Sequence, residues 1–539
     1  MTASVSRLAA LANWLRLYLA RTGRGTRVAM ALAGAVAALA AILAAETARK
    51  RPKYRGAVEA PERSWIVGHG IMFLTTHETR NDWAFYLARN HLDLGEGHTS
   101  HLTAPFAPPL IFTTSPANVE HVLKTKFDNY VKGPVFADHQ TQLLGHGIFN
   151  TDGDAWRAQR KTSSMIFSVR NFRDHMLHVF SRHARVLVDK LDTVAARGTV
   201  VDLHDWFHRF TLDAFMEIGF GTPVDSLQAD APLPFATAFD QAQSITSKRM
   251  IMGPVQRRIL EWWNGDAKRL QQCIKVTDDF AYRLIAQRRA DPNAGNAQDL
   301  LARFLAMKKP GSNQGYSDEE LRDVVINFII AGRDTTAQAL SWAIFELAQH
   351  PKVVAAMREE IARIVPTAFD STTDDGENLD YDAVTRDLVY VRAVFSEALR
   401  LHPSVPQEIK FAIHADTLPD GTPVRAGDGI IWSPYAMGRL TELWGDDALE
   451  FKPERWIGEN VPQPGPYKYP VFNAGPRTCL GQQMAYLEGV ACLVKLVSKF
   501  EFEVVNPDEV TYRTALTLLM KNGLKVRVRR YVSPAPVAA

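Results

Sequence analysis

The stretch FNAGPRTCLG, residues Phe472 to Gly481, ends in a cysteine turn that leads directly into a helical pattern from Gln482 to Phe500. A cysteine just ahead of a helix lies in the positive end of the helix dipole, which favours the thiolate over the thiol. Gly475 and Gly481 allow the backbone of this turn to approach a flat ligand closely. The stretch therefore predicts a reactive sulfur in a ligand-binding loop.

Cys479, the cysteine of this turn, lacks the partners that most protein metal sites need. The two other cysteines, Cys273 and Cys492, and the histidines do not stand near it at the spacing of a zinc or iron–sulfur site. A single thiolate can still be the one axial ligand of a haem iron, with Arg477 facing an anionic group and Phe472 covering the sulfur. The competing interpretation is a buried, inert cysteine in a glycine-rich turn.

Composition places the whole chain among globular proteins. Its 539 residues are 46% hydrophobic and 22% charged, which excludes a disordered tail or a fibre. Length alone favours several domains of about 150 residues each. The net charge of +3 is too small to indicate a nucleic-acid partner. Three cysteines cannot build a disulfide framework, so we expect the bulk of the chain on the reducing side of a membrane.

The N-terminal segment predicts a membrane anchor. Residues 28–45 read VAMALAGAVAALAAILAA and carry no charge, and a helix of this length spans about 27 Å, close to a bilayer's hydrocarbon thickness. Residues 1–27 form a basic amphipathic leader, and residues 46–61 form a charged, proline-containing linker to a domain over residues 62–535. Positive charge flanks the span on both sides, so charge counting does not orient it. An organellar transit peptide, plastid or mitochondrial, is the alternative.

Apolar spacing of three and four residues predicts mainly helices from about residue 80 to 400. One helix is unusually long: a capping box of Ser317 and Glu320 begins it, and the pattern continues to His350, before Pro351. Beyond residue 405, alternation and turn residues predict short strands. The fold class is therefore mainly α with small β-sheets, in one domain behind an anchor helix.

The pattern Phe-x-x-Gly-x-Arg-x-Cys-x-Gly resembles the haem-binding loop of the cytochrome P-450 monooxygenases, and further motifs agree in the right order. Glu397 and Arg400 resemble the family's Glu-x-x-Arg helix, and Arg455 lies in a Pro-Glu-Arg segment like the family's. The resemblance implies the single cytochrome P-450 fold, which replaces the several domains suggested by length. We expect Glu397 to be a buried carboxylate between Arg400 and Arg455, whereas an isolated Glu-x-x-Arg would be a surface pair.

The middle of the long helix reads Ala331-Gly332-Arg333-Asp334-Thr335-Thr336 and resembles the family's oxygen-activation motif. A glycine inside a helix costs about 1 kcal/mol relative to alanine, so Gly332 needs a reason, and a groove for dioxygen is one. Asp334 and Thr335 would form a proton relay. Hydroxyl back-bonding to a carbonyl is the alternative for the threonine. Some animal relatives carry a haem-esterified glutamate where Ala331 stands, so we expect non-covalent haem.

A second helical motif concerns the haem propionates. Trp156 and Arg160 match the family's Trp-x-x-x-Arg helix, which holds these groups, although a surface amphipathic helix would show the same spacing. The resemblance thus implies haem b with Cys479 as axial ligand, together with O2. It implies electrons from NADPH through cytochrome P-450 reductase, with cytochrome b5 as a possible second donor, and a single-pass protein of the endoplasmic reticulum membrane with its catalytic domain in the cytosol.

Within the family, the segments 147–150 (GIFN) and 401–406 (LHPSVP) are most like those of plant and fungal fatty-acid ω-hydroxylases. Hydroxylation of a fatty acid at its terminal carbon is therefore the expected reaction. Family placement suggests a substrate pocket lined by Phe149, Phe328, Ile329, Val405, Leu516, Thr517 and Leu518. A sterol, terpenoid or alkane substrate remains open. A haem sensor or carrier without turnover is the third possibility, and the relay pair argues against it.

Overall fold

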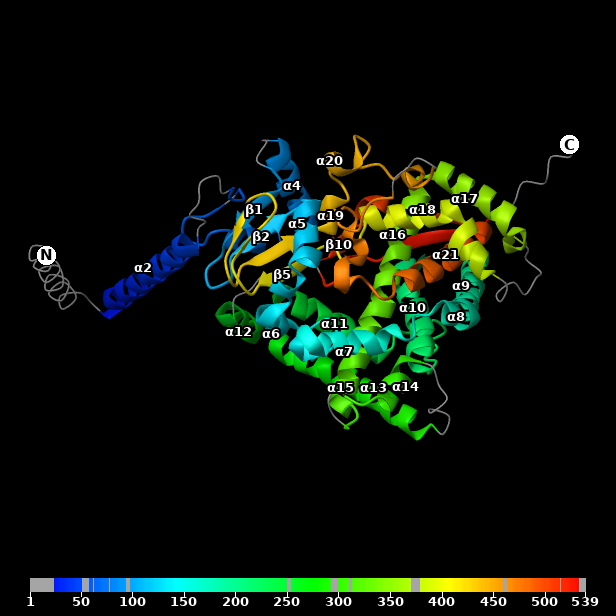
Figure 1. Ribbon diagram of the computed structural model, residues 1–539, viewed down its shortest axis with the longest axis horizontal. Helices are drawn as coiled ribbons and strands as arrows, with labels where there is room; N and C mark the ends of the chain where they lie inside the picture. The colour runs from blue at the N-terminus through cyan, green and yellow to red at the C-terminus, as the bar shows by residue number, and fades with distance from the viewer. Residues whose placement is uncertain are drawn as a thin grey trace, which may run out of the picture.

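The structure is a computed structural model that describes residues 24–50, 58–61, 63–76, 78–93, 97–249, 254–291, 299–309, 313–369, 379–458, 463–513 and 515–532. Helices make up most of this part of the chain. A sheet lies on the side from which the N-terminal helix projects, and a C-terminal strand, drawn in red, lies toward the opposite side (Figure 1). The predicted class, mainly α with small β-sheets in one domain behind an N-terminal helix, is confirmed.

The body is built from helices that pack in several directions around two central ones, α16 (Thr335–Gln349) and α21 (Gln482–Lys499). The shorter helices before residue 170 are α3 (Gly70–Thr75), α4 (Arg80–Asp93), α5 (Pro116–Glu120), α6 (Gly133–Leu144) and α7 (Gly153–Ser164). Those that follow are α8 (Val169–Asn171), α9 (Leu177–Arg197), α10 (Leu203–Phe220), α11 (Pro234–Arg249), α12 (Pro254–Trp263), α13 (Asp266–Ala290), α14 (Leu300–Ala306), α15 (Asp318–Ile329), α17 (Pro351–Ile364), α18 (Val389–Leu401), α19 (Pro434–Met437) and α20 (Thr441–Trp444).

The largest sheet has five strands in the order β1-β2-β8-β5-β3. Its strands are β1 (Thr99–Leu102), β2 (Leu110–Thr113), β3 (Tyr130–Val131), β5 (Glu408–Ala412) and β8 (Gly429–Trp432). β2 runs parallel to β8, with Leu110 opposite Gly429, so segments far apart in sequence form one sheet. The strands before residue 132 lie where apolar spacing favoured helix. They are too short for a period of two to register, and pairing with distant strands decides them.

A second sheet closes the C-terminal end of the chain against the helices. Its order is β4-β12-β9, built from β4 (Val200–Asp202), β9 (Phe500–Val504) and β12 (Lys525–Arg530). Two hairpins complete the sheets, β6 (Asp416–Thr417) with β7 (Pro423–Val424) and β10 (Tyr512–Arg513) with β11 (Leu519–Met520). The predicted strands beyond residue 405 are therefore present.

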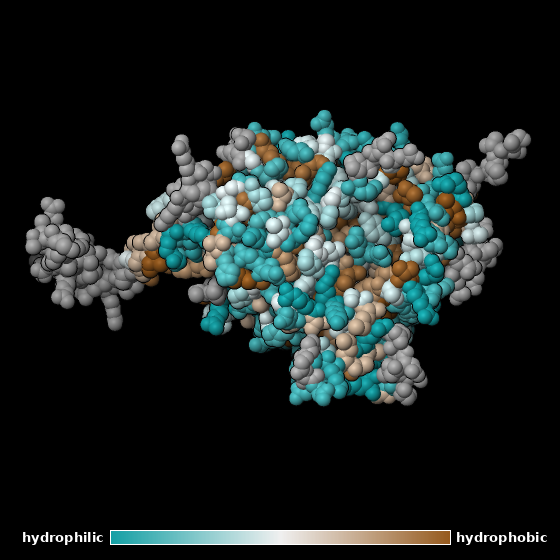
Figure 2. All heavy atoms as spheres, in the orientation of Figure 1, coloured by the Kyte–Doolittle hydropathy of each residue, from teal (hydrophilic) through white to brown (hydrophobic). Residues whose placement is uncertain are grey.

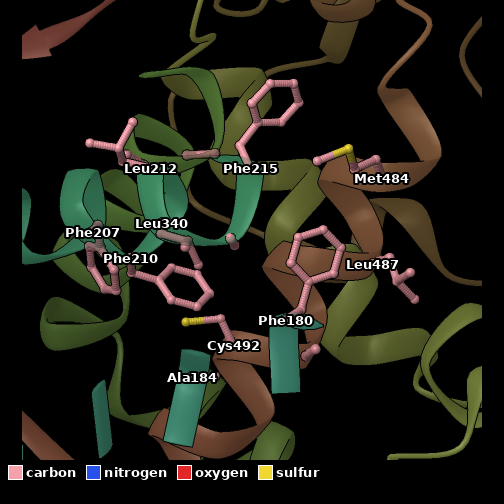
Figure 3. Close-up of a cluster of buried hydrophobic side chains, with 14 of the residues drawn as sticks. Phe180, Ala184, Phe207, Phe210, Leu212, Phe215, Leu340, Met484, Leu487 and Cys492 are labelled. Carbon is pink, nitrogen blue, oxygen red and sulfur yellow. The ribbon is translucent and has the colours of Figure 1, made fainter. Parts of the chain in front are cut away.

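The central core lies where four helices meet. Figure 3 shows phenylalanines of α9 and α10 meeting side chains of α16 and α21, with Phe180, Phe210 and Leu340 among the labelled residues. Cys492 of α21 is buried in this cluster, and Cys273 of α13 is buried as well. Both are free thiols. Because both are buried, Cys479 is the only described cysteine with an exposed side chain.

The long helix begins as the sequence predicts but is not regular throughout. Ser317 caps α15, with the Ser317 hydroxyl accepting from the Glu320 amide and the Glu320 carboxylate accepting from the Ser317 amide. Between α15 and α16 lies one π-helical turn, Ile330–Asp334, which coincides with the predicted oxygen-activation motif. Single π turns inside α-helices are frequent at functional sites. Side-chain pattern alone gave no sign of this turn.

The N-terminal helix α2 (Arg24–Lys50) is longer than the uncharged run it contains. Its outer part carries exposed apolar side chains such as Leu32 and Val36, and Figure 2 shows it hydrophobic where it leaves the body. By length and composition it is able to cross a membrane. Its last turn packs on the body, because the Thr47 hydroxyl donates to the Ile66 carbonyl. Residues 46–50, expected in the linker, are therefore helical, while the leader up to residue 23 and the linker residues 51–57 lie outside the described residues.

A buried carboxylate joins α18 to the segment before the cysteine loop. Arg400 donates from Nε and Nη2 to the two oxygens of Glu397, both at 2.8 Å, and neither side chain has any exposed surface. Arg455 donates from Nε to Glu397 Oε1 at 2.8 Å, and the indole of Trp456 donates to Oε2 at 2.9 Å. The backbone amide of Lys452 supplies a further donor at 2.8 Å. The carboxylate is therefore fully paired.

Removing the charge of Glu397 should cost much of the protein's stability. In Glu397→Gln, two buried guanidinium groups lose their counter-charge, which we expect to lower the free energy of unfolding by about 3–5 kcal/mol. Chemical denaturation measures this. Glu503→Gln is the control, because Glu503 pairs with Arg527 and Arg529 on the exposed surface and should cost no more than about 1 kcal/mol. Equal losses in the two variants would contradict the prediction.

Candidate active site

Close backbone contacts hold the cysteine loop, residues 472–481, in place. Gly475 has a φ of +60°, and a Cβ atom there would lie 2.2 Å from the carbonyl oxygen of Leu123, so only glycine fits. The amide of Cys479 donates to the carbonyl of Phe472 at 2.8 Å, which closes the turn. The ring of Phe472 packs against Tyr486 of α21 at 5.6 Å between centroids. The loop is thus fixed between the neighbouring helices.

The sulfur of Cys479 is surrounded by protein, although its side chain keeps accessible surface. Burial raises the pKa of this thiol, while a hydrogen bond from the Gly481 amide and the charge of Arg160 oppose the rise. The helix dipole expected to favour the thiolate is therefore outweighed by desolvation. A bound metal ion would deprotonate the thiol. A Cβ on Gly481 would lie 3.8 Å from the sulfur, in the space that glycine leaves open.

Cationic and aromatic side chains of α7 face this loop. Trp156 is buried, and the guanidinium of Arg477 stacks over its ring at 4.0 Å. Arg160 donates from Nη2 to the carbonyl of Thr478 at 2.7 Å, directly before the cysteine. Arg477 is tied to Asp152 at 2.8 Å but leaves its Nε buried without a partner. The structure thus brings Trp156, Arg160 and Arg477 together beside Cys479.

Lys410 of β5 joins this group, although no motif in the sequence indicated it as a site residue. Its side chain is 1% exposed, and its Nζ has no hydrogen-bond partner. Burial lowers the pKa of this ammonium group, and the charges of Lys132 and Arg477 lower it further. A buried cation that lacks an acceptor is costly unless a ligand supplies one. The sequence signal that could have indicated Lys410 is its position in a short strand between the apolar residues Ile409 and Phe411.

These residues fit the haem that the sequence indicated. Among the described residues, no group of three histidine, cysteine or acidic side chains could hold a metal ion, so the donor set is one thiolate. That suits a haem iron, which needs only one ligand from the protein because the porphyrin supplies the nitrogen ligands. The unpaired nitrogens of Lys410 and Arg477, with Arg160 nearby, suit the two propionates. Cys479 would hold the iron, and these cations the propionates.

A cavity of about 840 Å³ opens beside the long helix. Of the predicted pocket residues, Phe149, Val405, Leu516 and Thr517 line it, as do Ala331 and Thr335. Phe328, Ile329 and Leu518 instead lie in the hydrophobic core. A helix turns about 100° per residue, so residue 329 points away from the face that presents Ala331 and Thr335 to the cavity. Helical spacing does not explain the position of Phe328, which stands three residues before Ala331. The wall also includes aromatic residues that the sequence did not indicate, namely Phe73, Phe106, Phe136 and Phe411.

The relay pair of the long helix splits between two environments. Thr335 lines the cavity, and its hydroxyl donates to the carbonyl of Ala331 at 2.7 Å. Asp334 has no exposed surface and accepts from Gln243 Nε2 of α11 at 2.7 Å and from Arg333 Nη1 at 3.2 Å. Burial raises the pKa of Asp334 to about 6. The two side chains are adjacent in sequence but use different partners.

Gly332 does not provide the expected groove. A Cβ atom at this position would lie 2.0 Å from the ring of Phe215, which α10 presses against the π turn. The missing side chain therefore serves helix packing, and Gly332 faces the core where a contact with haem or dioxygen was expected. The sequence could not show this, because the neighbour comes from a helix more than a hundred residues away.

If Gly332 is required because a side chain there would collide with Phe215, the stability effects of substituting the two residues should be coupled. We expect Gly332→Ala to lower the free energy of unfolding by about 1–3 kcal/mol through overpacking. In a Phe215→Ala background the same change should cost less, because the ring is gone. A double-mutant cycle by chemical denaturation measures the coupling. Gly315→Ala is the control, because an added Cβ atom at this position would meet no neighbouring atom within 4 Å. Additive effects of the two substitutions would contradict the packing explanation.

Together, the single interior thiolate ligand, the cationic groups beside it and the cavity over a π turn define a haem-thiolate protein. Comparison with known proteins then places the chain. A family model described as Cytochrome P450 matches residues 60–528. The chain belongs to the cytochrome P450 family and is an oxidoreductase of the monooxygenase kind.

Similar proteins come from plants and fungi. "Cytochrome P450 704C1" of Pinus taeda is 40% identical over 78% of this chain and 84% of its own length. "Cytochrome P450 704B1" of Arabidopsis thaliana is 36% identical over 87% and 94%. "Cytochrome P450 monooxygenase cyp1" of Mycosarcoma maydis is 35% identical over 89% and 76%. A solved structure, "Crystal structure of cytochrome P450DA heme domain", superposes with a TM-score of 0.74 at 25% identity, covering 88% of this chain and 98% of its own.

Proposed function

We propose that this monooxygenase hydroxylates fatty acids at the terminal carbon, with electrons that cytochrome P-450 reductase delivers from NADPH. The observation that carries this proposal is the cavity, which has a largely apolar wall and is lined both by Thr335 of the long helix and by the last turn of α2. Its volume of about 840 Å³ suits a lipid-sized ligand. The motif resemblance to plant and fungal ω-hydroxylases supports the same substrate class.

The residues of this chain divide the work between them. Cys479 would hold haem b, which would supply the activation of O2 and the insertion of one oxygen atom into a C–H bond. The apolar wall excludes water and positions an alkyl chain beside Thr335. Phe149 and Val405, both predicted as pocket residues, form part of that wall. Selection of the carbon that reacts is therefore a matter of cavity shape.

Protons would reach this cavity through Asp334. On the other side of the long helix lies a polar cavity of about 490 Å³, lined by Asp240 and Arg333 among other charged residues. Arg333 pairs with Asp240 at 2.6 Å and donates to Asp334 at 3.2 Å. A carboxyl group with a pKa of about 6 exchanges protons readily near neutral pH. The proposed path leads from the polar cavity through Asp334 toward Thr335, whose hydroxyl donates to the carbonyl of Ala331 in this structure and would have to turn toward the cavity to pass a proton on.

This relay predicts a pH dependence with a definite sign. Asp334 carries its proton below pH of about 6 and loses it above, so product formed per NADPH should fall as pH rises through that value. Asp334→Asn should remove this dependence, and Thr335→Ala should lower the yield per NADPH by about tenfold. The exposed Asp154→Asn is the control. An unchanged yield in Thr335→Ala would show that the hydroxyl does not relay protons.

The surface near α2 supports attachment to the endoplasmic reticulum membrane with the catalytic domain in the cytosol. α12 exposes Ile259, Trp262 and Trp263, and tryptophan is enriched at membrane interfaces. α3 exposes Ile71 and Leu74. Because the end of α2 lines the large cavity, a membrane-dissolved substrate would have a short way in. Cytosolic exposure of the body would make it accessible to the reductase.

A mixed substrate panel tests the proposed reaction. The purified holoprotein with reductase and NADPH should convert lauric and palmitic acids to products hydroxylated at the terminal carbon, as mass spectrometry of the products shows. A sterol, a terpene and an alkane serve as competing substrates. Products hydroxylated only within rings would contradict the proposal. NADPH-independent haem binding without any product would instead indicate a sensor or carrier.

A further inference from the structure

Arg80, the first residue of α4, lines the same cavity as Thr335. Its Nε and Nη2 atoms are buried, and neither has a hydrogen-bond partner. Burial lowers the pKa of this guanidinium to about 10, and among the described residues Tyr512 opposes that shift. The group therefore stays charged at neutral pH while two of its donors remain unsatisfied, which is costly for the protein alone.

Most other charged residues of the cavity wall are paired within the protein, although Arg513 also leaves its Nε atom buried without a hydrogen-bond partner. Their ion pairs are Arg49–Glu46 at 3.1 Å, Lys132–Glu408 at 3.0 Å and Arg257–Asp138 at 2.6 Å. Lys50 donates from Nζ to the carbonyls of Ala104 and Ala107. Arg513 lies between the two cavities, where its charge lowers the pKa of Asp334. Arg80 has no such ionic partner among the described residues.

The position of Arg80 also matters. Figure 1 shows α4 beside β1 and β2, on the side of the molecule from which α2 projects, whereas α16 and α21 lie toward the other side. Apolar residues, among them Phe73, Leu102 and Leu516, occupy the same wall. A molecule with one charged end and a long apolar body would satisfy both features, because its charged end pairs with Arg80 while its chain fills the apolar space.

We propose that Arg80 binds the carboxylate of the substrate and so sets which end of the fatty acid faces Thr335. This proposal rests on the fatty-acid hydroxylation proposed above. A guanidinium presents parallel N–H donors that match the two oxygens of a carboxylate, and such charge-assisted bonds are among the stronger ones in proteins. Fixing the acid end at α4 leaves the methyl end to reach the reacting centre, which gives terminal hydroxylation a structural cause.

Binding of matched ligands to the holoprotein tests this anchor. Lauric acid and methyl laurate have the same chain and differ in charge, and the change in haem absorbance on binding gives a dissociation constant for each. We expect Arg80→Gln to weaken lauric acid binding by about tenfold or more, since a charge-assisted pair contributes at least about 1.4 kcal/mol. Methyl laurate binding should stay unchanged.

Two further variants complete the design. Arg89→Gln, on the same helix but exposed and near Asp93, should leave both ligands unaffected. Arg80→Lys keeps the charge but loses the fork, so it should weaken the acid less than Arg80→Gln, and it decides the question if Arg80→Gln does not fold. Equal effects on acid and ester, or no effect on either, would overturn the anchor while the proposed reaction stands. Failure of the wild-type protein to bind any fatty acid would overturn both.

Discussion

The buried carboxylate of Glu397 is the contact on which the rest of the structure depends. It gathers donors from α18 and from the segment around Arg455, and Arg400 in turn donates to the carbonyls of Ala448 and Glu450. The segment then leads toward the cysteine loop. The ring of Trp456 packs against Tyr469 at 4.8 Å, and the Tyr469 hydroxyl donates to the carbonyl of Ser396. Without a charge at Glu397, this chain of contacts would lose its common acceptor.

The long helix divides the interior into two chemical environments. Its face with Ala331 and Thr335 borders a largely apolar cavity, and Arg333 on another face borders a polar one. One environment suits a lipid chain, and the other suits water and protons. The helix therefore separates substrate from proton supply while its own side chains connect them.

Local patterns predicted much of this arrangement, because their residues act close to one another in sequence. The cysteine turn, the capping box of Ser317 and the Glu-x-x-Arg helix each fit within ten residues. The sequence did not predict the roles of Lys410 and Arg80. A cation looks ordinary in a sequence, and only the structure shows that these two have buried nitrogens without hydrogen-bond partners. The sequence also did not predict the packing of Gly332 against Phe215 or the pairing of β2 with β8. Each of these contacts joins segments that lie far apart in the sequence.

The π turn at Ile330–Asp334 has a consequence for how this helix can change. A π turn holds one residue more than an α turn, so deleting a single residue there would restore a regular helix. Because the extra residue is taken up within that single turn, the residues after it would keep nearly the same direction relative to α15. Thr335 would still line the lipid side, and α16 would still pack against α10. Deleting a residue from the regular turns of α15 or α16 would instead rotate everything beyond it by about 100°. The π turn is therefore the place in this helix where the chain can lose one residue without re-orienting α16.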